Sequence, residues 1–484
     1  MCSQFPSMLD KFSFTGSWNC SVFVDNKAYG SLEYSPTQGF LIKAQGYIRP
    51  EYASIFAFSS YPPLDISGFL DGRYYAEFND CRISSSHISH EGKLHLACQE
   101  FRSYRPATFT SIRRLRESDD WREGFFSFDI LDRWFQTRPF IQHPQLANVE
   151  DTGRIHTIAY DGSYKCFEDI DCGEYEISNS YSGSFTAAET MQSISYQPWL
   201  SVKYKEPCRI QRFTEMASYL RILLSVLAGK RALNSQIVLY PERVEGDPFV
   251  RERHTQIVLP TFEDNPQHES YAMPFDSRSL GDSLPIVFCK SIKVIKELSL
   301  FFDLFLASHI SDDSYLSYKF LTLVQALEGY HRLRMDSPRL PESEYVKYKE
   351  LLAKYYAEEL PNELRNSFVR ALDYGNEQSL RKRLHCLLDL IGDDNSSLII
   401  PKKSDFIERV VDWRNTISHA KPNLTKEDIQ LRSISDDYHR LHLLFASLLW
   451  MELGIPKNQI RAAWERGYRW IIRSLTNEQT AGAD

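Results

Sequence analysis

The spacing of hydrophobic residues changes along this 484-residue chain, and the change limits the folds that the chain can adopt. Up to about residue 200, apolar and polar residues alternate in short runs, as in strands with one buried face. After about residue 290, apolar residues recur every three or four positions, as in amphipathic helices. We therefore expect an α+β multidomain protein, in which a β-rich, sandwich- or barrel-like N-terminal region precedes an α-helical bundle.

Short predicted strands fill the first part of the chain. Segment 13–24 carries apolar residues at period two, and turn residues follow at Asp25–Asn26 and Gly30. Comparable segments, separated by Gly, Pro, Asp and Ser, lie at 32–34, 40–44, 74–78, 93–98, 154–160 and 175–178. Aromatic residues make up 13% of the chain, and much of this content lies in the first half. This suits strands, because aromatic side chains pack well on a pleated surface.

The segment between the strand-rich and helical parts has mixed character. A helix is expected over 213–229 with Gly229 as its C-terminal stop, and strands are expected at 236–240 and 254–259. The polar segment 262–285 predicts a linker, and we place the main domain boundary there. The expected division is a β-rich domain at 1–205, a mixed connecting region at 206–290 and a helical domain at 291–484.

The second half of the chain is predicted to be helical. Residues 320–330 form one broad apolar stripe of a helix whose N-terminal cap is expected within 311–313. Further helices are expected at 342–357, 362–372, 379–390, 404–420, 435–453 and 457–475. Helices of this length with short connections pack as an antiparallel bundle.

The cysteines and the apolar runs indicate the cellular compartment of the protein. Nine Cys are scattered without a CxxC pair, and the first residues lack the basic start and long apolar run of a secretory signal. Reduced cysteines and a cytoplasmic location are the simplest interpretation. The longest apolar runs, 219–228 and 441–451, are shorter than the roughly 20 residues that cross a membrane, so we expect core helices and no membrane contact.

Neither a metal site nor a bound cofactor is expected. The residues that most resemble a metal-ligand set are His87, His90 and His95, with Cys81 and Cys98. They lie on alternating, strand-like sequence, so their side chains need not converge on one ion.

Basic residues are concentrated in one part of an acidic protein. The net charge of −8 argues against binding of polyanions over the whole surface. Segment 401–476 differs, with 13 Lys and Arg against 9 Asp and Glu, and four arginines lie near its end: Arg461, Arg466, Arg469 and Arg473. These four either bind RNA at one domain or form a solvated helix face, and the sequence leaves both interpretations open.

The most informative segment is 410–419, where Arg414, Asn415 and His419 stand near the end of one predicted helix. RNA cleavage without a metal ion requires a group that transfers protons and a cation that stabilises charge on phosphorus. Histidine suits the first task because its ordinary pKa is about 6.5. Arginine suits the second because its planar fork matches two phosphate oxygens. We therefore predict that Arg414 and His419 are catalytic and that Asn415 assists them.

The spacing of the pair has a geometric consequence. Positions five apart lie about 140° around a helix, so a single helix would aim Arg414 and His419 poorly at one phosphate. Two copies of the chain that meet at this helix would combine both pairs in a shared cleft. The spacing therefore predicts a homodimer or a higher homo-oligomer.

The same Arg-x4-His spacing occurs twice elsewhere, so spacing alone is a weak signal. The pair Arg82/His87 lies in strand-like sequence, and the first residue of the pair Arg138/His143 is followed directly by a proline. The third pair lies late in a well-patterned helix, which favours function. A structural role also stays open for it, in which the arginine caps carbonyls and the histidine packs at the helix end.

These residues resemble a known group of proteins. Arg-Asn-x3-His near a helix end, within a C-terminal helical bundle, is similar to the motif of the HEPN superfamily of nucleases. Segment 321–332, LTLVQALEGYHR, resembles the first helix of ApeA-type HEPN proteins, which join a large β-rich N-terminal region to a C-terminal HEPN domain. The resemblance covers about residues 300–476. In the N-terminal region it rests on Gly16-Ser17-Trp18, the strand pattern and the overall layout.

The resemblance implies a metal-independent endoribonuclease that arrests or kills bacteria infected by phage. It implies a dimeric active site with Arg414, Asn415 and His419, transfer RNA as a substrate by analogy, and an N-terminal region that senses a phage component or silences the nuclease. It extends to Glu328 and His331 as supporting residues. A solvated ion pair for Glu328, and a surface or interface pair of His331 with Arg332, stay open as alternatives. The alternative is a HEPN-like bundle that binds nucleic acid or nucleotide, or dimerises, without cutting.

Overall fold

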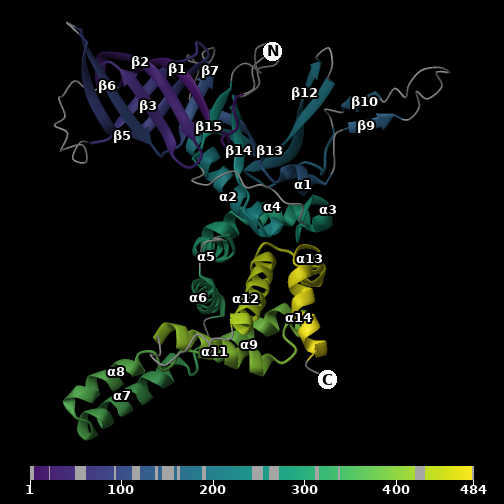
Figure 1. Ribbon diagram of the computed structural model, residues 1–484. Helices are drawn as coiled ribbons and strands as arrows, with labels where there is room; N and C mark the ends of the chain where they lie inside the picture. The colour runs from purple at the N-terminus through teal and green to yellow at the C-terminus, as the bar shows by residue number, and fades with distance from the viewer. Residues whose placement is uncertain are drawn as a thin grey trace. The chain divides into compact units, whose positions relative to one another are not determined.

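The computed structural model shows two compact units (Figure 1). The β-rich unit comprises residues 1–271 and 275–292, and the helical unit comprises residues 272–274 and 293–484. Each unit contains its own hydrophobic core. The residues that the structure describes are 5–20, 22–48, 62–91, 94–111, 120–136, 140–143, 157–160, 164–187, 192–241, 254–260, 272–310, 315–335, 338–419 and 431–481.

Six strands of the β-rich unit close into an antiparallel barrel. They are β1 (Phe12–Cys20), β2 (Phe23–Ser35), β3 (Gly39–Gln45), β4 (Leu64–Leu70), β5 (Tyr74–Glu91) and β6 (Leu94–Ser103). Strand β5 pairs with both β4 and β6, so the hydrogen-bonded ring β1–β2–β3–β6–β5–β4 closes on itself. Closure lets each strand pair on both sides. The β-rich, barrel-like region expected from the sequence is thus confirmed.

The same sheet continues from the barrel through the long strand β5. Seven strands follow in the order β7, β15, β14, β8, β13, β12, β11. Their bounds are β7 Ala107–Ser111, β15 Thr255–Val258, β14 Asn234–Tyr240, β8 Trp121–Phe128, β13 Gln192–Cys208, β12 Tyr175–Ala187 and β11 Ile170–Asp171. Strands β9 (Phe140–His143) and β10 (Thr157–Tyr160) form a separate antiparallel pair. The sheet therefore joins segments that lie far apart in the sequence.

Aromatic side chains form much of the barrel core. Trp18, Phe40, Phe78 and Phe109 are at most 1% exposed. The rings of Phe40 and Phe78 meet edge to face with centroids 5.2 Å apart, and those of Trp18 and Phe78 do so at 6.0 Å. Aromatic pairs favour this arrangement because the ring edge is positive and the face is negative. This core uses part of the aromatic content of the first half of the chain.

Strand β2 differs from its predicted course. The sequence suggested turns at Asp25–Asn26 and Gly30, but β2 runs through these residues, and the chain reverses between Cys20 and Phe23. The prediction was wrong because Gly30 has a different role. A Cβ at Gly30 would lie 1.9 Å from the carbonyl oxygen of Lys43 on β3. A glycine inside a strand here marks a close backbone approach rather than a turn.

Helix α2 (Ile210–Ala228) forms where the sequence predicts it and packs on the sheet. It ends at Gly229, whose φ of 63° lies in the left-handed region that favours glycine. Phe213 of α2 packs over Gly124 of β8, where a Cβ would lie 2.5 Å from the ring. The strands predicted after α2 are β14 and β15.

Part of the predicted linker is helical. Helix α3 (Ser277–Leu280) begins where the backbone NH of Ser279 donates to the Asp276 carboxylate at 2.7 Å. A 3-10 turn (Gly281–Ser283) leads into α4 (Leu284–Glu297). Phe288 of α4 packs against Trp134 of α1 (Leu131–Phe135), with ring centroids 6.1 Å apart. A capping box, rather than polarity, thus decides where this helical segment begins. Residues 262–271 of the predicted linker lie outside the described residues.

Two cysteines that are distant in the sequence are paired in the β-rich unit. Cys172, which follows β11, forms a disulfide with Cys289 of α4, and their Cα atoms are 4.9 Å apart. The expectation of reduced cysteines is therefore wrong for this pair. A separation of 117 residues explains why no local spacing indicated it. Five other described cysteines are free thiols: Cys20, Cys81, Cys98, Cys208 and Cys386.

Four helices form the centre of the helical unit: α6 (Leu316–Met335), α9 (Leu380–Ile391), α11 (Lys403–His419) and α12 (Leu431–Glu452). Their fully buried side chains include Phe320, Leu327, Leu387, Val410 and Leu444. Helix α5 (Ser299–Ile310) packs on α6 and α12, and α10 (Asp393–Ile399) packs on α9. This arrangement confirms the predicted helical bundle. The cap expected within 311–313 lies outside the described residues.

Two further helices form an antiparallel hairpin between α6 and α9 in the chain. They are α7 (Glu342–Glu359) and α8 (Asn362–Leu372), and they lie side by side, as Figure 1 shows. Both agree closely with the helices predicted at 342–357 and 362–372. Among the described helices of the protein, none is both long enough and apolar enough to cross a membrane.

The C-terminal segment forms two helices where one was predicted over 457–475. A 3-10 turn (Lys457–Gln459) leads into α13 (Ile460–Gly467), and α14 (Arg469–Ala481) follows. A Cβ at Gly467 would lie 2.3 Å from the ring of Pro274, so this position accepts only glycine without movement. The prediction of one continuous helix was wrong, because a contact with a residue distant in the sequence determines the break.

Candidate active site

Helix α11 contains the predicted catalytic pair, and its surroundings change along its length. In its first half, Phe406, Ile407 and Val410 are buried in the bundle. From Val411 to Ser418, every side chain is half-buried or exposed. Apolar packing therefore fixes the N-terminal half of α11, while the C-terminal half lies at the surface of the bundle.

An ion cluster fixes α11 to α12. Arg409 donates from Nε and Nη2 to the two carboxylate oxygens of Asp437, at 3.0 and 2.9 Å. Arg440 donates from Nη1 to the same carboxylate at 3.0 Å and from Nε to the carbonyl of Ile399 at 3.0 Å. Asp437 is fully buried, and a buried carboxylate is stable only with such partners. Hydrogen bonding to Asp437 raises the pKa of the Arg409 guanidinium, so this arginine remains charged.

Arg414 and Asn415 lie together in the surface half of α11. Arg414 is half-buried and donates from Nη1 to Oδ1 of Asn415 at 3.2 Å. Because the acceptor is a neutral amide, this hydrogen bond orients the guanidinium without neutralising its charge. His419 is the last residue of α11, and its side chain lies outside the described part of the structure. The arrangement places an oriented cation at the surface, one to two turns before the histidine.

Glu328 and His331 belong to a network between α6 and α9. Glu328 accepts from Arg332 at 3.4 Å, and Arg332 also pairs with Glu377 at 2.7 Å. His331 is buried, and its Nδ1 lies 3.3 Å from Nη1 of Arg383. A guanidinium only donates, so Nδ1 accepts and the ring is neutral with its proton on Nε2. Glu328 thus takes part in an ion pair within α6, whereas His331 lies at the contact between α6 and α9.

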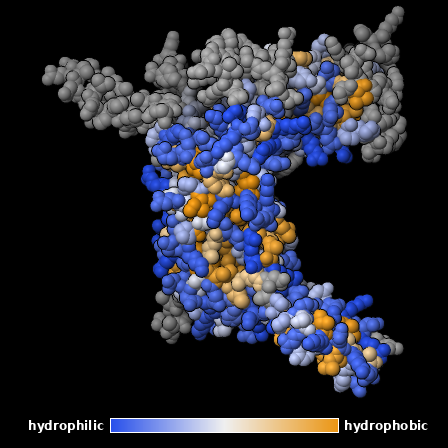
Figure 2. All heavy atoms as spheres, turned by 180° about the vertical axis from the view of Figure 1, so that it is seen from behind, coloured by the Kyte–Doolittle hydropathy of each residue, from blue (hydrophilic) through white to orange (hydrophobic). Residues whose placement is uncertain are grey.

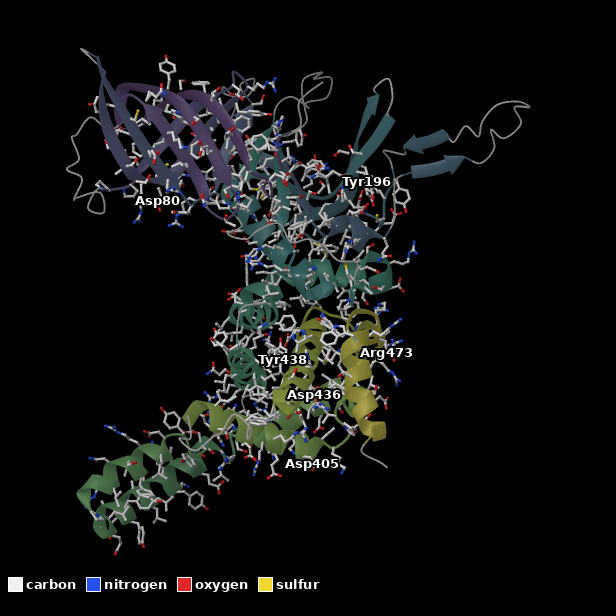
Figure 3. All side chains as sticks on the ribbon, viewed as in Figure 1. Asp80, Tyr196, Asp405, Asp436, Tyr438 and Arg473 are labelled. Atoms are coloured by element: carbon white, nitrogen blue, oxygen red, sulfur yellow. A yellow bond between two sulfur atoms is a disulfide. The ribbon has the colours of Figure 1, made fainter. Side chains whose placement is uncertain are left out.

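Three of the four predicted RNA-binding arginines are engaged within the protein. Arg461 pairs with Glu465 at 3.0 Å, and Arg466 donates from Nε and Nη2 to a backbone carbonyl at 3.1 and 2.8 Å. Arg469 is exposed and donates to the carbonyl of Glu465 at 3.3 Å. Arg473 is exposed on α14 (Figure 3). The structure therefore places Arg469 and Arg473 one helical turn apart at the surface. Arg466 instead forms hydrogen bonds within the protein.

Asp437 is the residue of this region that sequence reasoning missed. The buried residues Ile434, Leu441, Leu444 and Leu448 of α12 recur at three- and four-residue spacing, and Asp437 occupies a position of the same stripe. A carboxylate in an apolar stripe signals a buried partner, because an isolated buried charge is unfavourable. That signal is present in the sequence. One partner, Arg440, stands three positions later on the same helix, but Arg409 stands on a different helix, so no local pattern identifies it.

The described residues contain no group of three or more His, Cys, Asp or Glu side chains that is placed to hold a metal ion. The side chains of His87, His90 and His95 fall outside the described part. Cys81 is buried, and burial raises the pKa of its thiol to about 12. This thiol therefore stays protonated at neutral pH, and a protonated thiol is a poor metal ligand.

Comparison with protein-family models assigns both parts of the chain. The model of the Apea-like HEPN domain matches residues 321–459, which include most of α6 and all of α9, α11 and α12. The protein therefore contains a HEPN domain, a class that is commonly associated with nucleases and that commonly dimerises. The model of ApeA N-terminal domain 1 matches residues 13–290, and the chain belongs to the ApeA-type HEPN family. No curated protein and no solved structure matches the chain.

This assignment confirms the family that the motif and the first bundle helix predict. The matched HEPN segment contains Arg414, Asn415 and His419, and also Glu328 and His331. The arginines of α14 lie beyond it. The family is associated with defence and with nucleases, so nucleic-acid cleavage is the chemistry to consider at α11.

Proposed function

We propose that the protein is a metal-independent endoribonuclease of bacterial anti-phage defence, with Arg414, Asn415 and His419 as its active site. The observation that supports this most directly is the position of Arg414 in the surface half of α11, beside Asn415. The preceding part of the helix is fixed by the hydrogen bonds between Arg409 and Asp437. An arginine on such a fixed helix offers a preorganised cation to a phosphate.

The proposed reaction is attack by the 2′-hydroxyl of RNA on the adjacent phosphorus. His419 takes the proton of the 2′-hydroxyl and returns a proton to the leaving 5′-oxygen. The products are a 2′,3′-cyclic phosphate and a 5′-hydroxyl, so no water is consumed in this step. Arg414 stabilises the negative charge on the non-bridging oxygens of the phosphorane, and Asn415 orients the guanidinium of Arg414.

The functional unit is proposed to be a homodimer or a higher homo-oligomer. Arg414 and His419 occupy positions about 140° apart around the axis of α11, so one copy aims them poorly at one phosphate. Two copies that face each other through the C-terminal half of α11 combine an arginine of one copy with a histidine of the other. Trp413 and Ile417 are half-exposed on this half of the helix and supply apolar surface for that contact.

The proposed substrate is transfer RNA, bound in the cytoplasm of an infected cell. Arg469 and Arg473 are proposed to contact its phosphates, because both are exposed on α14. Arg461 and Arg466 are proposed to contribute less, because Arg461 forms a salt bridge with Glu465 and the half-buried Arg466 donates two hydrogen bonds to one backbone carbonyl. The β-rich domain at 1–205 and the connecting region at 206–290 are proposed to sense a phage component or to hold the nuclease silent until infection.

The test uses the intact gene in growing bacteria, as wild type and as Arg414→Ala and His419→Ala. Total RNA is separated on a gel during phage infection, and the amount of folded protein is measured in parallel. We expect discrete RNA fragments from the wild type and none from either variant. Asp412→Ala is the matched control, because Asp412 is exposed on the same half of α11 and has no proposed role.

Other outcomes assign a different function. If both variants protect against phage as well as the wild type does, the Arg–His pair is structural. RNA binding without cleavage under any trigger would then identify a nucleic-acid-binding HEPN bundle. Failure to bind RNA, even after deletion of the N-terminal region, would indicate a protein-interaction scaffold.

A further inference from the structure

The hairpin of α7 and α8 has no hydrophobic interior of its own. Helix α7 contains no buried residue, and none of the described side chains of α8 is buried. The two helices meet through the rings of Tyr356 and Phe368, 5.4 Å apart, and through a hydrogen bond from the Tyr345 hydroxyl to the Leu372 carbonyl. Isolated helices shorter than about 12–15 residues are marginal in water, and α8 has 11 residues. The hairpin therefore requires a surface that covers it.

Six exposed apolar side chains mark the surface to be covered. They are Tyr348 (49% exposed), Leu351 (67%), Leu352 (37%), Tyr355 (59%), Leu364 (50%) and Phe368 (44%). The four on α7 recur at three- and four-residue spacing and so share one face of the helix. Figure 2 shows hydrophobic side chains gathered on this hairpin among hydrophilic ones. A contiguous apolar patch of this kind indicates an interaction site, whereas single exposed apolar residues do not.

Hydrogen bonds and an ion pair fix the base of the hairpin, and so they fix the position of the apolar patch. The side chain of Asn376 accepts from the backbone NH of Leu340 at 2.9 Å and donates to the Leu340 carbonyl at 3.0 Å. The carbonyl of Asn376 accepts from the backbone NH of Arg339 at 2.9 Å. Lys349 of α7 pairs with Asp373 at the end of α8, at 2.6 Å. A surface that is ordered before binding loses little conformational freedom in the complex.

The charge of the hairpin argues against RNA as the occupant. Residues 342–372 contain six acidic and five basic side chains, so their net charge is −1. A surface that binds a phosphate backbone carries an excess of Lys and Arg instead. A nearly neutral hairpin with interspersed charges of both signs faces an identical surface without net repulsion.

We propose that the α7–α8 hairpin is a self-association surface that pairs with the same hairpin of a second copy of this chain. Two antiparallel hairpins together form a four-helix bundle, whose interior would be the two apolar patches. The contact is isologous, because the same patch lies on both sides of a twofold axis. This inference does not depend on RNA cleavage. It names a contact through which the proposed homo-oligomer associates.

The exposed apolar area suits a dimer contact. A large aromatic side chain offers about 150–250 Å² when it is fully exposed. At the exposures of the six side chains, each patch amounts to roughly 500–600 Å², so two copies would bury about 1,000–1,200 Å² in total. This area reaches the lower end of specific, stable interfaces. Burial of Tyr348 and Tyr355 at the centre would provide the aromatic anchors that dominate such contacts.

Sedimentation velocity of the full chain over a concentration series tests the proposal. The test variant combines Leu351→Glu with Tyr355→Glu. The matched control is Leu300→Glu on α5, because Leu300 is also an exposed helical leucine, at 62%. Leu351→Met is a second control that keeps the patch apolar, and circular dichroism checks the fold of each protein.

We expect the wild type and both controls to sediment with the same mass, an even multiple of 56.4 kDa. The hairpin variant should have half that mass, with a dissociation constant raised at least about 30-fold. A monomeric wild type, or a hairpin variant with the wild-type mass at all concentrations, would overturn the inference. A loss of RNA binding with unchanged mass would identify RNA as the occupant and would also overturn it. RNA cleavage is scored on the same samples, so lost cleavage with retained mass bears only on the proposed function.

Discussion

Arg409 of α11 donates two hydrogen bonds, of 3.0 and 2.9 Å, to the carboxylate of Asp437 on α12, and this carboxylate is fully buried. Arg414 lies five positions further along the same helix, half-buried beside the neutral amide of Asn415. Two arginines of one helix thus have opposite surroundings. The first neutralises a buried acid, and the second keeps its charge available at the surface.

Replacement of these two arginines should therefore have different effects on the stability of the protein. Loss of one partner of a buried ion pair costs about 3–5 kcal/mol, and Arg440 remains to compensate part of this. We expect Arg409→Ala to lower the free energy of unfolding by about 2–3 kcal/mol and Arg414→Ala to change it by less than about 0.5 kcal/mol. Urea denaturation followed by circular dichroism measures both. Equal stability of the two variants would contradict the anchoring role of Arg409.

Arg414→Lys separates positive charge from the planar geometry of the guanidinium. Lysine keeps the charge but cannot donate two parallel hydrogen bonds to one phosphate. We expect single-turnover cleavage of a defined RNA by the purified protein to fall about 10²–10³-fold, with unchanged stability. Asp412→Ala serves as the control on the same helix half. A lysine variant that cleaves at the wild-type rate would show that charge alone suffices at this position.

Alkaline pH should destabilise the helical unit through its buried tyrosines. Burial raises the pKa of Tyr438 to about 12, and burial together with a hydrogen bond to Glu452 raises the pKa of Tyr330 well above its usual range. A phenol whose pKa is raised on folding contributes its full stability below the unfolded pKa of about 10. That contribution is lost as the pH rises from about 10 toward the folded pKa.

Tyrosinate absorbance and far-ultraviolet circular dichroism, recorded on the same samples, measure this effect. We expect part of the tyrosine ionisation to coincide with loss of helical signal above about pH 10. Tyr438→Phe and Tyr330→Phe should shift that transition to higher pH, because phenylalanine cannot ionise. Complete ionisation of all tyrosines near pH 10 with an intact helical signal would contradict the prediction.

Reduction of the disulfide between Cys172 and Cys289 should destabilise the β-rich unit. The bond closes a loop that spans 117 residues, and such a link removes conformations from the unfolded chain. We expect the free energy of unfolding to fall by about 2–4 kcal/mol. Thermal unfolding with and without reductant checks this. The double variant Cys172→Ser/Cys289→Ser should match the reduced wild type and should not respond to reductant. A wild type that contains the bond and yet unfolds identically in reductant would refute the effect.

Local sequence patterns located most of the secondary structure and indicated the family. Helix α2 ends at Gly229, and α7, α8 and α11 lie within two residues of their predicted bounds. These predictions succeeded because the apolar period of a helix and its terminal residues are both set by neighbouring positions. The motif of Arg414, Asn415 and His419 also lies within one helix, and the family comparison agrees with it.

Predictions failed where a distant residue decides the local structure. Gly30 looked like a turn residue but lies in β2 against the backbone of Lys43. Gly467 looked like part of a continuous helix but marks a break against Pro274. Glycine has no side chain, so its local pattern does not distinguish a turn, a break and a close approach.

The sequence by itself determined that a β-rich region precedes a helical bundle, and it singled out Arg414, Asn415 and His419 as candidates. Both follow from consecutive positions, because hydrophobic period and residue type are local properties. Only the tertiary structure decided that β5 closes the barrel, that His331 is a buried neutral ring and that Asp437 holds Arg409. Each of these contacts depends on which distant segments of the chain meet in the folded core. Hydrophobic burial alone does not specify that pairing, because it is non-directional, and the pairs are determined only when the whole unit packs.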